Sequence, residues 1–234
     1  MRKVIGCWGR GRGPSPFPVP GNEMLNYYGK QIKRLGIDMR LNCRATEQAL
    51  KALAPYAVIV ATGSQPIVPK IEGIDKANVL LVRDVLQDQP QITNKNIVVI
   101  GAGMTGVEVA ELYADKGNKV TVIDMLPPIN PAATPFNELI TLGKAMARGI
   151  TIQMERKLLE IKDGEIVVED TANQQVLTLP ADTVILSMGV KPENALYENI
   201  QGSFDRVYNI GDSEKTGTIH DAVVAGSKLG YALA

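Results

Sequence analysis

Three glycines with a defined spacing form the strongest chemical signal in the sequence, Gly101-x-Gly103-x-x-Gly106. An apolar run at 96–100 precedes them and a helical pattern at 107–116 follows, so the motif lies in a strand–turn–helix context. In such a turn the first glycine permits a tight bend, the second lets a pyrophosphate approach the backbone, and the third allows close helix–strand packing. The free amides at the start of the helix favour bound phosphates. The motif therefore predicts a dinucleotide site.

Asp124 follows the next apolar strand, 119–123, and lies 18 residues after Gly106. A carboxylate at this place accepts hydrogen bonds from an adenosine ribose and repels a 2′-phosphate, which favours NAD(H) over NADP(H). The alternative is a cluster of turn glycines with an exposed aspartate and no ligand. We expect the NAD(H)-binding residues to be Gly101, Ala102, Gly103, Met104, Thr105, Gly106 and Asp124.

Composition narrows the class of protein. The chain has 234 residues, with 25 Lys and Arg against 25 Asp and Glu, so it lacks the basic excess of a nucleic-acid binder. Its only cysteines, Cys7 and Cys43, exclude a disulfide framework and a cluster held by several local thiolates, and no metal site is expected. No apolar run reaches the ~18 residues that cross a bilayer. We expect a cytoplasmic protein that does not contact membranes.

The elements that must position the glycine turn follow from apolar periodicity. Strand 96–100, helix 107–116 and strand 119–123 make a βαβ unit. Helices are further expected at 23–35, 135–148 and 220–234, strands at 37–41, 57–61 and 183–189, and a hairpin at Asp163-Gly164. The run from Ala57 suits a strand covered on both faces. These patterns predict an α/β protein with a parallel sheet.

Three more apolar segments end in glycine, where backbone at the edge of a sheet can face a ligand. They are Ala61-Thr62-Gly63-Ser64, Met188-Gly189-Val190-Lys191-Pro192 and Asn209-Ile210-Gly211-Asp212. Spacing alone assigns them no role, and Asp212 alone reads as a turn residue after glycine.

Together the fragments resemble the flavoprotein disulfide-reductase-like module with two dinucleotide-binding domains. More closely, the chain resembles the C-terminal part of the NADH:flavin oxidoreductase / 2,4-dienoyl-CoA reductase family, which is related to old yellow enzyme. The matching stretches run in the family's order from about Pro20 to the end. They are Pro20-Gly-Asn-Glu-Met-Leu, Leu35-Gly-Ile-Asp-Met-Arg-Leu-Asn, Ala57-Val-Ile-Val-Ala-Thr-Gly-Ser, Ile100-Gly-Ala-Gly-Met-Thr-Gly-Val-Glu-Val-Ala, Met188-Gly-Val-Lys-Pro-Glu-Asn and Tyr208-Asn-Ile-Gly-Asp.

The resemblance implies a Rossmann-like NAD(H)-binding domain at 93–187, inserted in an incomplete FAD-binding-type domain at 1–92 and 188–234. It implies that Glu108 belongs to the nicotinamide-binding pattern, although a solvated helix residue or a cap partner is an equal alternative. It also implies that Asp212, beside Gly211, holds the FAD ribityl chain. Further cofactor-binding positions follow from the matched segments, namely Ala61, Thr62, Gly63 and Gly189.

The family's first FAD motif should lie before residue 20, and residues 1–19 do not repeat its glycine spacing. Prolines at 14, 16, 18 and 20 forbid the helix that would bind the phosphates. We therefore read this segment as a remnant or an altered start. FAD binding is possible but should be weak, and the remaining sheet should have an exposed edge that invites a second chain.

The leading hypothesis is a truncated module that binds NADH and passes hydride to FAD for reduction of an unsaturated substrate. No acid–base or nucleophilic set of residues is expected, because the chemistry belongs to the cofactors. Whether the chain is an enzyme by itself stays open. The alternatives are a non-catalytic nucleotide-binding subunit that completes a partner, and a fragment of a longer chain. Expected partners are NADH and a second copy or a barrel protein that carries FMN and an iron–sulfur cluster.

Overall fold

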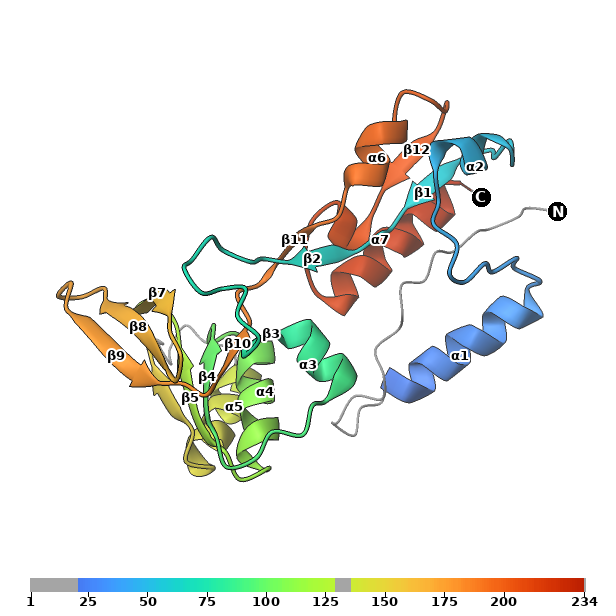
Figure 1. Cartoon of the computed structure of the whole chain (residues 1–234). Helices are drawn as coiled ribbons and strands as arrows, with labels where there is room; N and C mark the ends of the chain where they lie inside the picture. Colours follow the sequence, from blue (N-terminus) through green and yellow to red (C-terminus); the bar gives the residue numbers. More distant parts are fainter. Residues whose placement is uncertain (1–20, 129–135, 234) are drawn as a thin grey trace. The chain divides into compact units, whose positions relative to one another are not determined.

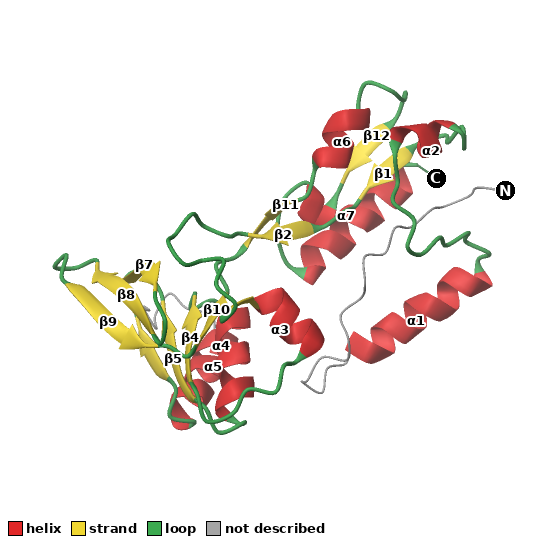
Figure 2. Cartoon of the chain, viewed as in Figure 1, coloured by secondary structure: helices red, strands yellow, loops and turns green. Residues whose placement is uncertain are grey.

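The computed structural model describes residues 21–128 and 136–233. Its helices are α1 (Gly21–Arg34), α2 (Glu47–Lys51), α3 (Val82–Asp88), α4 (Met104–Ala114), α5 (Phe136–Ala147), α6 (Ala195–Ile200) and α7 (Ile219–Ala232), with a short 3₁₀ helix η1 (Gly211–Ser213). Its strands are β1 (Val58–Val60), β2 (Ser64–Pro66), β3 (Val79–Leu81), β4 (Asn96–Ile100), β5 (Lys119–Ile123), β6 (Thr151–Gln153), β7 (Arg156–Ile161), β8 (Glu165–Asp170), β9 (Val176–Pro180), β10 (Thr183–Leu186), β11 (Val190–Pro192) and β12 (Val207–Asn209). Figure 2 shows helices and strands interspersed along the chain, as in an α/β protein.

The chain forms two compact units. One, the inserted unit, spans Pro66–Gly189, and the other, the outer unit, contains the described residues before and after it. The boundary differs from the one expected at residue 93. Residues 66–92 join the inserted unit because β3 pairs with β10 of its sheet and Val85 of α3 lies in its core.

A five-stranded parallel sheet forms the centre of the inserted unit, with strand order β3-β10-β4-β5-β6. The chain leaves β4 through α4 and returns in β5, while β10 pairs with the opposite side of β4. The carboxyl end of β4 is therefore the point where the strand order changes direction, and ligands of such sheets bind at this point. The expected α/β class with a Rossmann-like parallel sheet is confirmed.

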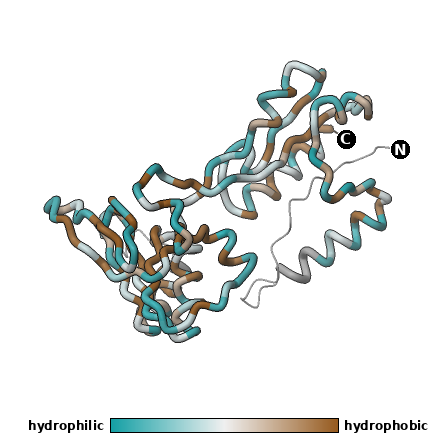
Figure 3. Tube along the Cα trace, in the orientation of Figure 1, coloured by the Kyte–Doolittle hydropathy of each residue, from teal (hydrophilic) through white to brown (hydrophobic). Residues whose placement is uncertain are grey.

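Both faces of this sheet are covered. Ile97 and Val99 of β4 pack among residues of α3, α4 and α5, whereas Val98 and Ile100 pack among residues of β7 and β8. The antiparallel sheet β7-β8-β9 thus provides the second cover. Brown, apolar segments gather around β4, β10 and α4 in Figure 3. The continuous apolar pattern of 96–100 reflects burial on both sides.

The outer unit contains a parallel pair, β1 and β12, with Val58 aligned to Val207. Val58 and Val60 are buried in a small core with Ile200 of α6, but Ile59 between them is 47% exposed. The expectation that this strand is covered on both faces is therefore wrong. The strand expected at 37–41 is also wrong. These residues have irregular structure, since β1 pairs with β12 and with no other strand of the described residues.

Most other expected elements are confirmed, including the hairpin at Asp163-Gly164 between β7 and β8. Helix α4 begins at Met104, three residues earlier than expected. The segment 1–19, read as a remnant of a flavin motif, lies outside the described residues.

Candidate functional site

The turn after β4 can be made only by glycine at Gly101. Its φ is +112°, and a Cβ added there would lie 2.2 Å from the carbonyl oxygen of Ser187. Its N–H donates to the carbonyl of Ile123 at 2.8 Å. The end of β4 is therefore held between β5 and β10, and the chain bends sharply into α4.

Gly103 and Gly106 do different things in this turn. Gly103 is the N-cap of α4 and is exposed, and a Cβ added there would meet nothing within 4 Å. A Cβ on Gly106 would lie 2.1 Å from the carbonyl oxygen of Gly101. The third glycine thus packs the helix against the turn, while the second leaves open space beside the first amides of α4, which no side chain caps.

Asp124 is joined to this turn by its carboxylate. Oδ2 accepts a hydrogen bond from the backbone N–H of Ala102 at 2.8 Å, and Oδ1 accepts one from Leu126 at 2.9 Å. Each carboxylate oxygen has two lone pairs, so each can accept one more hydrogen bond, for example from a ribose hydroxyl. The side chain is half-buried and reaches solvent.

The remaining residues of the predicted NAD(H) set lie in the first turns of α4. Met104 is half-buried, Thr105 is exposed, and Glu108 is half-buried one turn further on. The structure therefore brings all eight predicted residues to one end of the sheet. Open space at Gly103, uncapped helix amides and a nearby carboxylate are the features that a pyrophosphate joined to a ribose requires, so the residues fit NAD(H).

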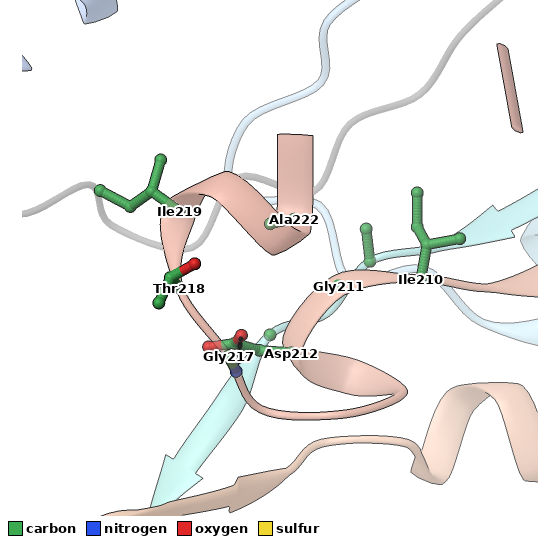
Figure 4. Close-up of a pocket in the computed structure, with 9 residues that line it drawn as sticks. Ile210, Gly211, Asp212, Gly217, Thr218, Ile219 and Ala222 are labelled. Atoms are coloured by element: carbon green, nitrogen blue, oxygen red, sulfur yellow. Dashed lines mark hydrogen bonds between the residues drawn. The ribbon is translucent and has the colours of Figure 1, made fainter. Parts of the chain in front are cut away.

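A second group of predicted residues surrounds a pocket of about 370 Å³ in the outer unit (Figure 4). It is lined by Ala61, Gly63, Ile210, Gly211, Asp212, Gly217, Thr218, Ile219 and Ala222. Four of these, Ala61, Gly63, Gly211 and Asp212, were predicted from the sequence. The pocket thus lies where β1 and β12 end and α7 begins.

Asp212 is the charged group of this pocket. Its Oδ1 accepts a hydrogen bond from the N–H of Gly217 at 3.1 Å, and its Oδ2 accepts one from the hydroxyl of Ser64 at 3.2 Å. Figure 4 shows Asp212 beside Gly217, with Thr218 and Ile219 on the turn that opens α7. The preceding Gly211 has φ +66°, a left-handed conformation that suits glycine.

Two predicted residues lie away from the pocket lining. The hydroxyl of Thr62 donates to the carbonyl of Glu193. The N–H of Glu193 donates to the carbonyl of Gly63 at 2.9 Å, so these bonds join the segment after β1 to the segment after β11. Gly189 belongs to the inserted unit, where its φ is +81° and its carbonyl accepts from the N–H of Ile67 at 3.0 Å.

The pocket suits an uncharged, hydroxyl-bearing group better than a phosphate. Its lining supplies one carboxylate, one hydroxyl, backbone groups and apolar side chains, and it contains no Lys or Arg. A carboxylate accepts hydrogen bonds from hydroxyl groups and repels phosphate. These residues fit the sugar-alcohol part of a flavin. Binding of a diphosphate would require other residues.

The start of α7 contributes residues that sequence reasoning missed. Thr218 is the N-cap, and it forms a capping box in which its Oγ1 accepts from the N–H of Asp221 and Oδ2 of Asp221 accepts from the N–H of Thr218. The hydroxyl of Thr218 also donates to Oδ2 of Asp221 at 2.6 Å, and this bond, followed by the one from the Thr218 N–H, lowers the pKa of Asp221. The pattern Thr218-x-x-Asp221 after Gly217 was an available signal for this helix start.

No metal or membrane feature accompanies these sites. Within residues 21–128 and 136–233, no group of three or more His, Cys, Asp or Glu side chains is arranged to hold a metal ion. Over the same ranges, no helix combines the length and apolarity that crossing a bilayer demands.

Comparison with known proteins defines the class. Residues 22–226 match the pyridine nucleotide-disulphide oxidoreductase family, and the chain belongs to this family. Members of the family and the related oxidases and reductases bind NAD(P)H and FAD. The chain thus has the fold of a flavoprotein oxidoreductase, as the sequence predicts.

Individual relatives are much longer than this chain. The chain is 30% identical over 220 residues to an NADH oxidase of Thermoanaerobacter brockii, covering 91% of this chain and 34% of that protein. It is 25% identical over 214 residues to a cinnamate reductase of Clostridium sporogenes, covering 90% and 31%. A solved structure of 2-naphthoyl-CoA reductase with 2-naphthoyl-CoA has a TM-score of 0.81 at 31% identity, covering 92% and 33%. The chain therefore spans about a third of the length of these relatives.

Proposed function

We propose that this chain is the NADH- and flavin-binding module of an oxidoreductase of the NADH:flavin oxidoreductase / 2,4-dienoyl-CoA reductase family, related to old yellow enzyme. The observation that carries the proposal is the Gly101–Gly106 turn, whose open second glycine lies beside a carboxylate bonded to the same turn. When bound, NADH supplies a hydride and FAD accepts it.

The chain's own residues bind and orient these cofactors. The amides at the start of α4 hold the pyrophosphate of NADH, and Asp124 accepts hydrogen bonds from its adenosine ribose. Asp212 accepts hydrogen bonds from the ribityl hydroxyls of the flavin in the pocket that Ala61 and Gly211 line. We assign Glu108, in the second turn of α4, to the NADH site, and Thr62 and Gly189 to further cofactor-binding segments.

The substrate class follows from the relatives and belongs to the proposal. Cinnamate reductase and 2-naphthoyl-CoA reductase are named for unsaturated substrates, and both match this chain over about nine-tenths of its length. An unsaturated, conjugated acid or thioester is therefore the class we assign to the complete enzyme.

A visible absorption spectrum tests the flavin part of the proposal. The purified chain is mixed with excess FAD and measured without desalting, because the expected FAD affinity is weak, and we expect a shifted flavin band that NADH bleaches under anaerobic conditions. Asp212→Ala should lose the shift, whereas Gly103→Ala should keep the shift and lose the bleaching by NADH. A wild-type chain that leaves the spectrum of added FAD unchanged would contradict flavin binding by this chain alone.

The second candidate is a nucleotide-binding subunit that completes another protein. It is favoured by Ile59, a large apolar side chain 47% exposed on a sheet of two strands among the described residues. Uncovered strands and apolar faces invite pairing with another chain. Saturable NADH binding by a colourless chain would support this candidate. A doubled mass in light scattering would then indicate a homodimer, and binding of an FMN and iron–sulfur barrel protein would indicate a hetero-complex.

A further inference from the structure

Asn209 and Ser213, which flank Gly211-Asp212, are joined by two hydrogen bonds, one between their side chains and one from the Asn209 side chain to the Ser213 backbone. The hydroxyl of Ser213 lies 2.7 Å from Oδ1 of Asn209, and Nδ2 of Asn209 donates to the carbonyl of Ser213 at 2.9 Å. The reciprocal pair closes a ring over the segment that contains Asp212. Ser213 is completely buried, whereas Asn209 is half-buried.

The same hydroxyl also lies close to two backbone carbonyls next to the pocket. Oγ of Ser213 is 2.9 Å from the carbonyl oxygen of Ile210 and 3.3 Å from that of Val60. Val60 is the last residue of β1, and the next residue, Ala61, lines the pocket. The N–H of Ile210 also donates to Val60 at 3.0 Å. The Asn209–Ser213 pair therefore lies where the two strands that bound the pocket meet.

The position of the Asp212 carboxylate depends on this arrangement. Gly211 has a left-handed φ of +66°, and Asp212 lies on the single turn η1 between the two bonded side chains. Its carboxylate accepts only moderately long bonds, 3.1 Å from Gly217 and 3.2 Å from Ser64. Ser213→Ala removes the 2.7 Å bond and Asn209→Ala removes both bonds between the two residues, so loss of either side chain should loosen the turn.

We propose that Asn209 and Ser213 are positioning residues, whose reciprocal hydrogen bonds hold the Asp212 carboxylate in the geometry that accepts the hydroxyl groups of a flavin side chain. The inference rests on the proposed function, because it assigns what orients Asp212 in that pocket. Neither residue lines the pocket, so each acts through Asp212.

Ligands with and without hydroxyl groups test this role. Riboflavin carries the ribityl chain, whereas lumiflavin has the same ring system without it. Each flavin is titrated with the full chain, and binding is measured from the change in flavin fluorescence. We expect Ser213→Ala and Asn209→Ala to weaken riboflavin binding about tenfold and to leave lumiflavin binding unchanged. Asp212→Ala should do the same, and the double variant Asp212→Ala/Ser213→Ala should lose no more than Asp212→Ala alone.

Ser203→Ala is the matched control, because Ser203 also donates a short hydrogen bond in the outer unit, to Glu47 at 2.6 Å, away from the pocket. It should keep the wild-type preference for riboflavin over lumiflavin. If Ser213→Ala weakens both flavins equally, or if its effect adds fully to that of Asp212→Ala, the positioning role is overturned.

Amide hydrogen exchange, measured by NMR, tests the positioning role of Asn209 and Ser213 without any flavin. A wild-type chain that binds no flavin would contradict the proposed function, and the exchange experiment would still test the positioning role. The amide of Gly217 reports on Asp212 because it donates to that carboxylate. We expect its exchange to accelerate several-fold in Ser213→Ala and not in Ser203→Ala. Equal exchange in the two variants would overturn the inference.

Discussion

The carboxylate of Asp124 accepts a hydrogen bond at 2.8 Å from the backbone amide of Ala102, which lies between the first two glycines of the turn after β4. The group expected to bind the ribose of NADH therefore also holds the turn expected to bind its phosphates. We therefore expect one side chain to determine both selectivity for the nucleotide and order of the turn. Substitutions of Asp124 should reveal both effects together.

Asp124→Ala should bind NADH about 10- to 100-fold more weakly, because hydrogen bonds to a charged group contribute about 1.5–3 kcal/mol. Loss of the negative charge removes repulsion of a 2′-phosphate, so the preference for NADH over NADPH should shrink. The released Ala102 amide leaves the turn less ordered, and NADPH affinity should stay below the wild-type affinity for NADH. Fluorescence titration with both nucleotides measures this. A variant that binds NADPH as tightly as the wild type binds NADH would show that the turn does not need Asp124.

Gly103 and Gly106 should separate nucleotide binding from folding. Gly103→Ala adds a methyl group in open space at φ −65°, so the melting temperature should stay near the wild-type value. The methyl group occupies the approach of the pyrophosphate, and NADH binding should fall at least tenfold.

Gly106→Ala should have the opposite pattern. Its Cβ would lie 2.1 Å from the carbonyl of Gly101, which is backbone and cannot rotate away. Overpacking of this kind costs about 1–3 kcal/mol, so the variant should melt earlier. Thermal unfolding by circular dichroism, measured beside NADH titration, compares the two variants. Equal melting temperatures would show that helix α4 shifts to accommodate the methyl group.

The core of the inserted unit could be read from the sequence because its strands are buried on both faces. In β4 every residue from Ile97 to Ile100 is buried, so the apolar run is continuous and its ends are clear. The strands of the outer unit were predicted less well from the sequence, and the reason is physical. A strand forms only beside another strand, and residues 37–41 alternate as a strand would but have no described neighbour to pair with.

The candidate sites were predictable where glycine is obligatory. Gly101 and Gly106 approach other backbone atoms so closely that no side chain fits, and this requirement is visible in the sequence as a fixed spacing of glycines. Residues that act through hydrogen bonds between distant parts of the chain show no such spacing in the sequence. Ser64 bonds to Asp212 and Ser213 reaches Val60, and each pair is separated by about 150 residues in sequence. Such contacts depend on tertiary structure, and local spacing does not encode them.

Asn118 should be a strong determinant of stability in the inserted unit. Its buried side chain accepts from the N–H of Lys95 at 3.1 Å and donates to the carbonyls of Ile92 at 2.7 Å and Tyr113 at 2.8 Å. Asn118→Ala removes three hydrogen bonds worth about 1 kcal/mol each, so urea unfolding should show a loss of about 2–3 kcal/mol. Asn173→Ala is the control, because exposed Asn173 makes only a local bond to Gln175. Similar losses in both variants would contradict a role for burial at Asn118.

Asp182 should make the stability of the inserted unit depend on pH in the acid range. Its Oδ2 accepts from the backbone N–H of Asn96 at 2.8 Å and from Nδ2 of Asn96 at 3.0 Å, tying the loop before β10 to the start of β4. These hydrogen bonds, first the backbone one, lower the pKa of Asp182 below its usual value. Since an unfolded aspartate titrates near pH ~3.9, the stabilisation is complete above that pH and is lost as the pH falls through the lower, folded pKa.

Asp182→Asn removes the charge, so the variant should be less stable than the wild type at pH 7. The two proteins should converge as the pH falls below the ordinary aspartate pKa and through the lower, folded pKa of Asp182, because the wild-type carboxyl then becomes neutral as well. Urea unfolding at a series of pH values from 7 down to below the folded pKa of Asp182 measures this convergence, with Asp75→Asn as the matched change at an exposed aspartate of the same unit. A stability difference that stays constant over this range would mean that Asp182 acts through its shape and not through its charge.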